Sequence, residues 1–218
     1  MVNGVIFDLD GVICDTAEYH YLAWKELGDK LGISLDREFN ENLKGISRIE
    51  SLERILELGS KQQEYTIAEK EKLTTEKNEL YLELIKGVTP NDLLPGINEF
   101  LHSLKKEGFK IGLASASINA PLLLEKLEIK SLFNTIVDPT TLTNGKPDPD
   151  IFLKGAKQLD LPVSECIGIE DSYSGIQAIN GAGMFSVGIG DRSILTEANI
   201  VYPSTVQLDV DRIVELVK

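Results

Sequence analysis

The sequence predicts an α/β protein in which a Rossmann-like, doubly wound parallel sheet forms the core and an all-α cap domain is inserted. Short apolar runs recur along the chain and alternate with stretches of helical spacing, which is typical of a parallel sheet covered on both faces. One long segment breaks this alternation and contains only helical patterns. The length of 218 residues fits one large domain with an insertion.

The predicted strands are short apolar runs bounded by turn residues, a pattern that is typical of buried strands. They cover residues 4–7, 111–114, 135–137, 166–169 and 185–189. The helices predicted between them cover residues 97–107, 121–128, 150–159 and 174–181. We therefore assign residues 1–15 and 91–218 to the α/β core domain and residues 16–90 to the helical cap domain.

The predicted cap begins with a helix at residues 17–31, whose N-cap is Asp15 or Thr16. Ser47-Arg48-Ile49-Glu50 is a capping-box pattern that begins a second helix. An insert that leaves and re-enters beside the end of the first strand is placed to act as a lid over it. A third helix is predicted at residues 66–86, with an apolar face made of Leu73, Leu80, Tyr81 and Leu84.

Charge and cysteine content exclude several classes of protein. The 35 acidic residues outnumber the 22 basic ones, and a net charge of −13 argues against nucleic acid as a partner. The chain lacks an apolar run of about 18–20 residues, the length that a membrane span needs. Its N-terminus does not resemble a signal peptide. Cys14 and Cys166 are too few for a disulfide scaffold, so we expect two thiols in a cytoplasmic protein.

Carboxylate, hydroxyl and lysine side chains follow four of the predicted strands at their carboxyl ends. Ligands of open parallel sheets bind at this edge. Carboxylates that crowd together need a cation, and hard oxygen ligands suit Mg²⁺. We expect Asp8 and Asp171 to bind the ion directly, Asp10 through its backbone carbonyl, and Glu170 through a bound water. The residues expected to meet at this edge are Asp8, Asp10, Ser115, Lys146, Glu170 and Asp171.

Four segments resemble the four motifs of the haloacid dehalogenase superfamily in order and spacing. They are Asp8-Leu9-Asp10-Gly11-Val12, Ser115, Lys146-Pro147 and Glu170-Asp171. The helical insert also lies where this superfamily carries a cap. Within the superfamily, the chain resembles the β-phosphoglucomutases most clearly at residues 15–20, 43–48, 76–78 and 114–119.

This resemblance implies a Mg²⁺-dependent isomerase that interconverts β-D-glucose 1-phosphate and D-glucose 6-phosphate. The reaction would pass through an aspartyl phosphate and glucose 1,6-bisphosphate, and the protein would act as a monomer. In physical terms, Asp8 is the carboxylate nucleophile and Asp10 the general acid and base. Lys146 and Ser115 would bind phosphoryl oxygens. A sugar-phosphate phosphatase of the same fold stays open, and a non-catalytic sensor is disfavoured because both aspartates are present.

A mutase must also hold a second phosphate far from the reacting one. Arg48 lies in the first turn of the helix that Ser47 caps, where free N–H groups and the helix dipole favour an anion. The alternative is an ordinary capped helix with a surface arginine. The residues expected to bind substrate are Thr16, His20, Lys44, Gly45, Ile46, Ser47, Arg48, Lys77, Ala116, Ser117 and Asn119.

Three positions leave alternatives open. His20 can hydrogen-bond Asp10 or serve a purely structural role beside an apolar face. Lys77 on the inward face of its helix suggests an anionic substrate, but it can also extend along apolar surface toward water. Ile118 departs from the mutase pattern, which usually has a basic residue between Ser117 and Asn119. This departure leaves room for the phosphatase hypothesis.

Overall fold

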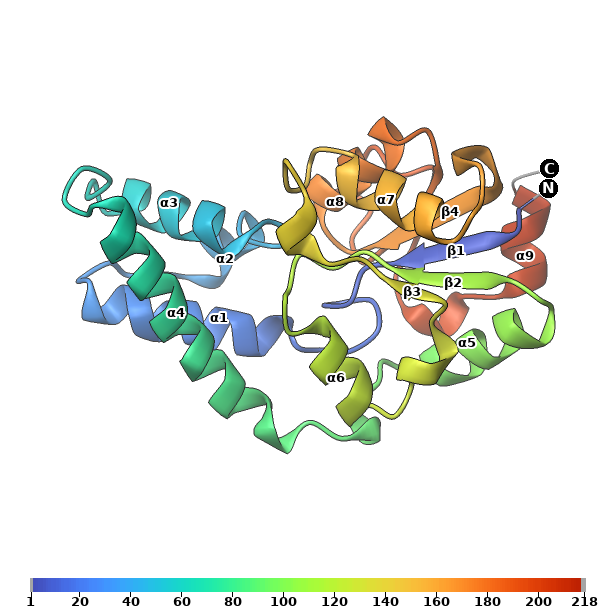
Figure 1. Cartoon of the computed structure of the whole chain (residues 1–218), viewed down its shortest axis with the longest axis horizontal. Coiled ribbons are helices and arrows are strands. Elements are labelled where there is room, and N and C mark those ends of the chain that lie inside the picture. Colours follow the sequence, from blue (N-terminus) through green and yellow to red (C-terminus); the bar gives the residue numbers. More distant parts are fainter. Residues whose placement is uncertain (1, 217–218) are drawn as a thin grey trace. The chain divides into compact units, whose positions relative to one another are not determined.

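The computed structural model describes residues 2–216 and divides into two compact units. One unit combines Met1–Asp15 with Val88–Lys218, and the other is Thr16–Gly87. The first unit contains all six strands, whereas the described secondary structure of the second is helical (Figure 1). The chain therefore has an α/β fold with a helical insertion.

Six parallel strands form one sheet in the order β3-β2-β1-β4-β5-β6. The central strand β1 pairs with β2 on one side and with β4 on the other, so the strand order reverses beside β1. Ligands bind at such a reversal, outside the carboxyl ends of the strands. The strands are β1 (Gly4–Phe7), β2 (Lys110–Leu113), β3 (Thr135–Ile136), β4 (Cys166–Glu170), β5 (Phe185–Ile189) and β6 (Ile200–Tyr202).

Helices cover both faces of this sheet (Figure 1). Helices α7 (Asp150–Gln158) and α8 (Tyr173–Gly181) pack on one face, and α5 (Ile97–Lys106) and α9 (Val210–Leu216) lie on the other. The shorter α6 (Ala120–Lys126) connects β2 to β3. Among the residues buried beneath α7 and α8 are Ile6, Phe152, Ile176 and Ile179.

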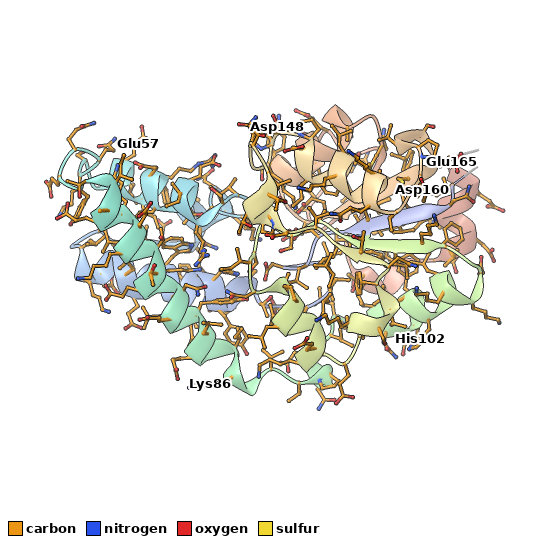
Figure 2. The ribbon with its side chains drawn as sticks, viewed as in Figure 1. Glu57, Lys86, His102, Asp148, Asp160 and Glu165 are labelled. Carbon is orange, nitrogen blue, oxygen red and sulfur yellow. The ribbon has the colours of Figure 1, made fainter. Side chains whose placement is uncertain are left out.

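The polar site segments lie at one end of this layered core. Figure 2 shows Asp148, which follows the Lys146 segment, at the opposite end of the core from Asp160 and Glu165, which precede β4. Because all strands run parallel, their carboxyl ends meet at one edge. The sheet thus brings together segments that are more than a hundred residues apart in the sequence.

The helical unit has its own core. Its helices are α1 (Ala17–Lys30), α2 (Arg37–Glu41), α3 (Arg48–Leu58) and α4 (Ile67–Leu84), and α4 packs against both α1 and α3. Ser47 is the N-cap of α3 and accepts a hydrogen bond from the Glu50 N–H. Only this half of the predicted capping box forms, because the Glu50 carboxylate instead accepts a hydrogen bond from Arg54. The buried core residues include Trp24, Leu27, Leu52, Ile55 and Leu56.

The predicted apolar face of α4 is confirmed at Tyr81 and Leu73 but not at Leu84. The buried residues of this helix are Thr74, Lys77 and Tyr81, whereas Leu84 is 37% exposed. Lys77 lies on the inward face of the helix, as the sequence predicts. The structure buries it among aromatic rings, so Lys77 and Tyr81 are at the centre of the buried face, with Leu73 packed beside them.

Other differences concern short elements. The predicted strands and helices of the core agree with the structure to within one or two residues at their ends. Three elements are not predicted from the sequence: the edge strand β6, the terminal helix α9 and the five-residue helix α2. Such brief segments show too few repeats of a helical or strand pattern to be detected. Within residues 2–216, no helix has the length and apolar character to cross a membrane, and both cysteines are free thiols.

Close packing of β4 against α8 predicts a stability effect. A Cβ atom added at Gly168 would lie 2.5 Å from Cγ1 and 2.8 Å from Cγ2 of Ile179, a branched side chain that cannot bend away. We expect Gly168→Ala to lower the free energy of unfolding by about 1–3 kcal/mol in a thermal or urea titration.

Gly181→Ala is the matched control, because its Cβ atom would meet Pro149 at an ordinary 3.5 Å and the residue ends α8. The control should be neutral or slightly stabilising, since alanine favours a helix. Equal stability of the two variants would contradict this packing.

Candidate active site

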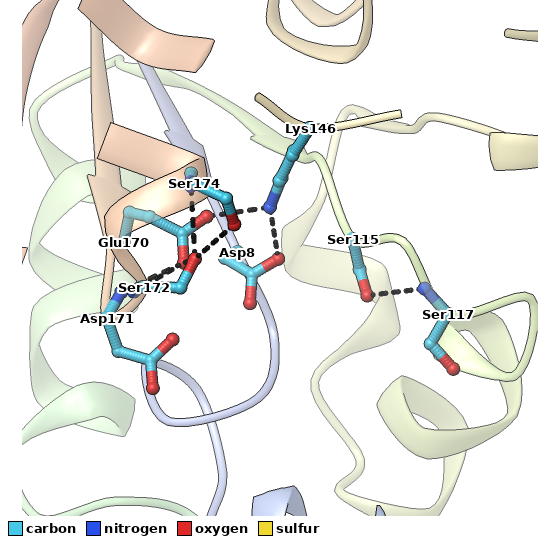
Figure 3. Close-up of polar contacts among 9 residues, drawn as sticks. Asp8, Ser115, Ser117, Lys146, Glu170, Asp171, Ser172 and Ser174 are labelled. Atoms are coloured by element: carbon cyan, nitrogen blue, oxygen red, sulfur yellow. Dashed lines mark hydrogen bonds and ion pairs between the residues drawn. The ribbon is translucent and has the colours of Figure 1, made fainter. Parts of the chain in front are cut away.

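A buried ion triad lies at the carboxyl end of β1. The Lys146 ammonium donates to the Asp8 carboxylate and to Oε2 of Glu170, both at 2.7 Å (Figure 3). All three side chains are almost completely buried. Asp8 directly follows β1, Glu170 ends β4, and the two strands are paired, so the sheet itself sets these carboxylates side by side.

Burial and charge act in opposite directions on this triad. Burial, followed by repulsion from Glu170, raises the pKa of Asp8 to about 7, although Lys146 opposes the shift. Burial lowers the pKa of Lys146, but attraction from Asp8 and Glu170 outweighs it, so its pKa is raised and the lysine stays charged. A charged lysine beside a carboxylate whose pKa is near neutral is an arrangement suited to catalysis.

Glycines allow the acidic groups to approach the backbone. Gly11 has a φ of 77°, and a Cβ atom there would lie 2.2 Å from a carboxylate oxygen of Asp171. Only glycine fits this position, on both grounds. Gly175 has a similar role beside Glu170, because a Cβ atom added at this glycine would lie 1.9 Å from Oε2 of Glu170.

Three carboxylates form a group that can hold a metal ion. One oxygen from each of Asp8, Glu170 and Asp171 lies within 4.8 Å of the others. Asp10 lies in the turn after β1, and its charge also raises the pKa of Asp8. An all-oxygen donor set in which negative charges crowd together fits a hard divalent cation and does not favour a thiolate-binding metal.

The loop after β2 presents hydroxyl groups at the same edge of the sheet. Leu113 pairs with Phe7, so Ser115 and Asp8 emerge from neighbouring strand ends (Figure 3). Ser115 is buried and its Oγ accepts a hydrogen bond from the Ser117 N–H at 3.1 Å. Ser117 Oγ in turn accepts from the Asn119 N–H at 3.3 Å. Ala116 and Ile118 lie between these residues, and the Ile118 side chain is 42% exposed.

A buried lysine lies in the helical unit. Lys77 is 1% exposed, its ammonium lies 2.6 Å from Nδ1 of His20, and it faces the rings of Trp24 and Tyr81. His20 stacks on Tyr81. Burial, followed by repulsion from Lys77 and then Arg48, holds the pKa of His20 well below its usual value. His20 is therefore a neutral imidazole, and Lys77 is packed in the core of the unit instead of reaching out to water.

The other predicted binding residues of this unit lie just before α1 or around the start of α3. Thr16 is the buried N-cap residue of α1, although its side chain makes no capping hydrogen bond. Gly45 has a φ of 73°, and burial lowers the pKa of Arg48. Lys44 pairs with Glu41 at 3.0 Å, and Ile46 is buried.

Several residues of these networks were not identified from the sequence as parts of a site. Ser172, Gly175 and Phe152 surround Glu170 and Lys146, and the Lys146 ammonium lies 5.2 Å from the centre of the Phe152 ring. Trp24 and Tyr81 pack on Lys77. A signal for Ser172 was present, because a serine before a helical stretch that follows a strand is a preferred N-cap.

Comparison with known proteins agrees with this geometry. Residues 2–183 match the haloacid dehalogenase-like hydrolase family. The chain is 53% identical over 210 residues to the β-phosphoglucomutase of Bacillus subtilis (strain 168), covering 96% of this chain and 93% of that protein.

Solved structures and more distant relatives extend the comparison. The β-phosphoglucomutase of Clostridium difficile superposes with a TM-score of 0.98 at 51% identity, covering 100% of this chain and 97% of that one. A phosphorylated carbohydrates phosphatase of Thermotoga maritima is 27% identical over 92% of this chain and 93% of its own length. The family match, which spans most of the sequence, and the motif residues gathered around Asp8 show that the chain belongs to the haloacid dehalogenase-like hydrolases.

Proposed function

We propose that this chain is a β-phosphoglucomutase that interconverts β-D-glucose 1-phosphate and D-glucose 6-phosphate. The observation that carries the proposal is 53% identity over nearly the whole chain to a protein of that name. The buried Asp8–Lys146–Glu170 triad supports it, because the triad supplies a carboxylate and a cation for phosphoryl transfer.

Asp8 is the proposed nucleophile. Its carboxylate attacks the phosphorus atom of glucose 1,6-bisphosphate, the bond to the sugar oxygen breaks, and an aspartyl phosphate forms. Asp10 gives a proton to the departing sugar oxygen and removes one from the attacking hydroxyl in the reverse direction. Lys146 and Ser115 bind the phosphoryl oxygens, where negative charge gathers in the transition state.

Mg²⁺ is the proposed cofactor. Asp8, Asp171 and the backbone carbonyl of Asp10 would bind it directly, and Glu170 would contact it through a bound water. When bound, the ion withdraws negative charge from the phosphoryl group and orients it for in-line attack. The all-oxygen cluster within 4.8 Å supports this choice.

The catalytic cycle has two phosphoryl transfers, and the sugar bisphosphate reverses its orientation between them. The aspartyl phosphate gives its phosphoryl group to the O6 hydroxyl of glucose 1-phosphate, which yields glucose 1,6-bisphosphate. After the bisphosphate reverses its orientation, Asp8 takes the phosphoryl group from O1 and leaves glucose 6-phosphate. Each orientation needs a binding site for the phosphate that does not react.

We assign the binding of this phosphate to residues of two groups, those in the loop after β2 and those in the helical unit, which we propose as the cap. The turn of Gly45 and the capped N-terminus of α3 support an anion site at Arg48. The neutral His20 beside Lys77 supports a role in binding or orienting groups of the reaction. The assigned residues are Thr16, His20, Lys44, Gly45, Ile46, Ser47, Arg48, Lys77, Ala116, Ser117 and Asn119.

The second candidate function is a sugar-phosphate phosphatase. Ile118 favours it, because an exposed apolar residue in the loop after β2 supplies no charge for a second phosphate. Both functions need Asp8, Lys146 and Asp171, so these residues do not separate them. Free thiols at both cysteines support a cytoplasmic location, and we propose a monomer as the state in solution.

One assay decides between mutase and phosphatase. Purified protein receives β-glucose 1-phosphate, Mg²⁺ and a trace of glucose 1,6-bisphosphate, and glucose 6-phosphate and inorganic phosphate are followed together. A mutase yields glucose 6-phosphate well ahead of phosphate and prefers the β anomer to the α anomer. Phosphate as the dominant product would overturn the proposal in favour of a phosphatase.

Substitutions separate the roles of the two aspartates. Asp8→Asn should abolish phosphoenzyme formation, because an amide is not a nucleophile. Asp10→Asn should still bind substrate and Mg²⁺ but lose turnover by about 10²–10⁴, the usual contribution of general acid–base catalysis. Acid quenching with mass spectrometry detects the aspartyl phosphate, and a trapped phosphoenzyme in Asp8→Asn would refute the assignment.

A basic side chain at position 118 should strengthen the binding of the substrate phosphate that does not react. A charged hydrogen bond contributes about 1.5–3 kcal/mol when shielded but an exposed ion pair only about 0–1 kcal/mol. With the position half exposed, Ile118→Lys should lower KM for glucose 1,6-bisphosphate by about threefold to tenfold, with a smaller change in kcat.

The gain should shrink as salt concentration rises. Ile118→Gln is the control, because it adds polarity without charge. An unchanged KM for the lysine variant at low salt would mean that position 118 points away from the substrate.

A further inference from the structure

Glu170 is fixed by four hydrogen bonds, two of which come from one neighbouring serine. Its Oε1 accepts from the Asp171 and Ser172 backbone N–H groups, both at 3.0 Å, and from Ser172 Oγ at 2.9 Å. Its Oε2 accepts from the Lys146 ammonium at 2.7 Å. One carboxylate oxygen is thus held by the start of α8, and this orients the other toward Lys146 (Figure 3).

The Ser172 hydroxyl is itself held in place. Ser172 is 4% exposed and is the N-cap of α8, where its Oγ accepts a hydrogen bond from the Gly175 N–H at 3.1 Å. The Gly175 N–H is a donor only, so the hydroxyl proton is left for an acceptor. Of the two oxygens within reach, Glu170 Oε1 at 2.9 Å is charged and nearer than Ser174 Oγ at 3.4 Å. Gly175 also leaves room for the carboxylate, because a Cβ atom there would overlap Oε2.

We infer that Ser172 is a positioning residue: it fixes the orientation of the Glu170 carboxylate, which in turn fixes the position of the Lys146 ammonium. The inference rests on the proposed function, in which Lys146 binds the phosphoryl oxygens during transfer. Two hydrogen-bond steps join Ser172 to the lysine, and the lysine reaches Asp8 in a third. The serine does not touch the reacting atoms in this scheme.

Loss of the hydroxyl has a defined consequence. Without Oγ, only backbone N–H groups hold Oε1, so the carboxylate can turn about its terminal bond and carry Lys146 with it. A cation displaced from its place stabilises the transition state less well. Binding of the sugar phosphate depends on other residues, so kcat falls and KM changes little.

The test compares two N-cap substitutions by steady-state kinetics of the full chain. Ser172→Ala should lower kcat by about 10-fold to 100-fold with KM within twofold, as is usual for residues that orient an active group. Ser172→Thr should restore most of kcat, because threonine keeps both the hydroxyl donor and the cap. Thr66→Ala removes the N-cap of α4 and should leave kcat unchanged.

A double-mutant cycle shows whether the effect passes through Glu170. In a Glu170→Gln background, Ser172→Ala should cause less than a threefold further loss of kcat, because the Glu170–Lys146 ion pair that the serine orients is already lost. Undiminished loss in that background, or a Ser172→Ala variant that behaves like Thr66→Ala, would overturn the inference. If Ser172→Ala does not fold, Ser172→Gly replaces it, since glycine is a better N-cap residue than alanine.

The same cycle separates this inference from the proposed function. A wild-type protein that releases phosphate instead of making glucose 6-phosphate would refute the mutase proposal alone. The cycle would then be measured on phosphate release, because Lys146 serves phosphoryl transfer in both reactions. Coupling between Ser172 and Glu170 in that assay would support the positioning role, and its absence would refute it.

Discussion

The site depends on one buried cation, the ammonium group of Lys146, which lies 2.7 Å from each of two carboxylates. A buried lysine without such partners would lose its charge, and two buried carboxylates without the lysine would repel each other. The triad therefore stabilises three ionisable groups that are individually unfavourable at this depth. Its net negative charge also explains why the same edge favours a divalent cation.

The parallel sheet makes this arrangement possible. Asp8 and Glu170 come from paired strands, and Ser115 follows the strand on the other side of β1, so three segments distant in sequence meet without long loops. Glycines at positions 11 and 175 then let acidic side chains lie against the backbone. The helical unit follows a similar rule, because its buried Lys77 is accommodated by a neutral histidine and two aromatic rings.

Most of the core could be predicted from the sequence because its strands are short, apolar and bounded by turns. The acidic motif residues were predictable for the same reason, since they follow those strands directly. The complete burial of Lys77 was not, because its partners from α1 cannot be recognised from periodicity alone. Ser172 was also missed: its role arises from a hydrogen bond to Glu170, which requires three-dimensional contacts to recognise.

The charge balance between Lys146 and Asp8 is tested most directly by titrating the Asp8 carboxyl carbon by NMR in metal-free protein. Burial and Glu170 raise the pKa of Asp8 to about 7, and Lys146 restrains that rise. In Lys146→Met the restraining charge is gone, so the carboxyl should titrate at higher pH than in the wild type. An unchanged or lower pKa for Asp8 in this variant would contradict the account.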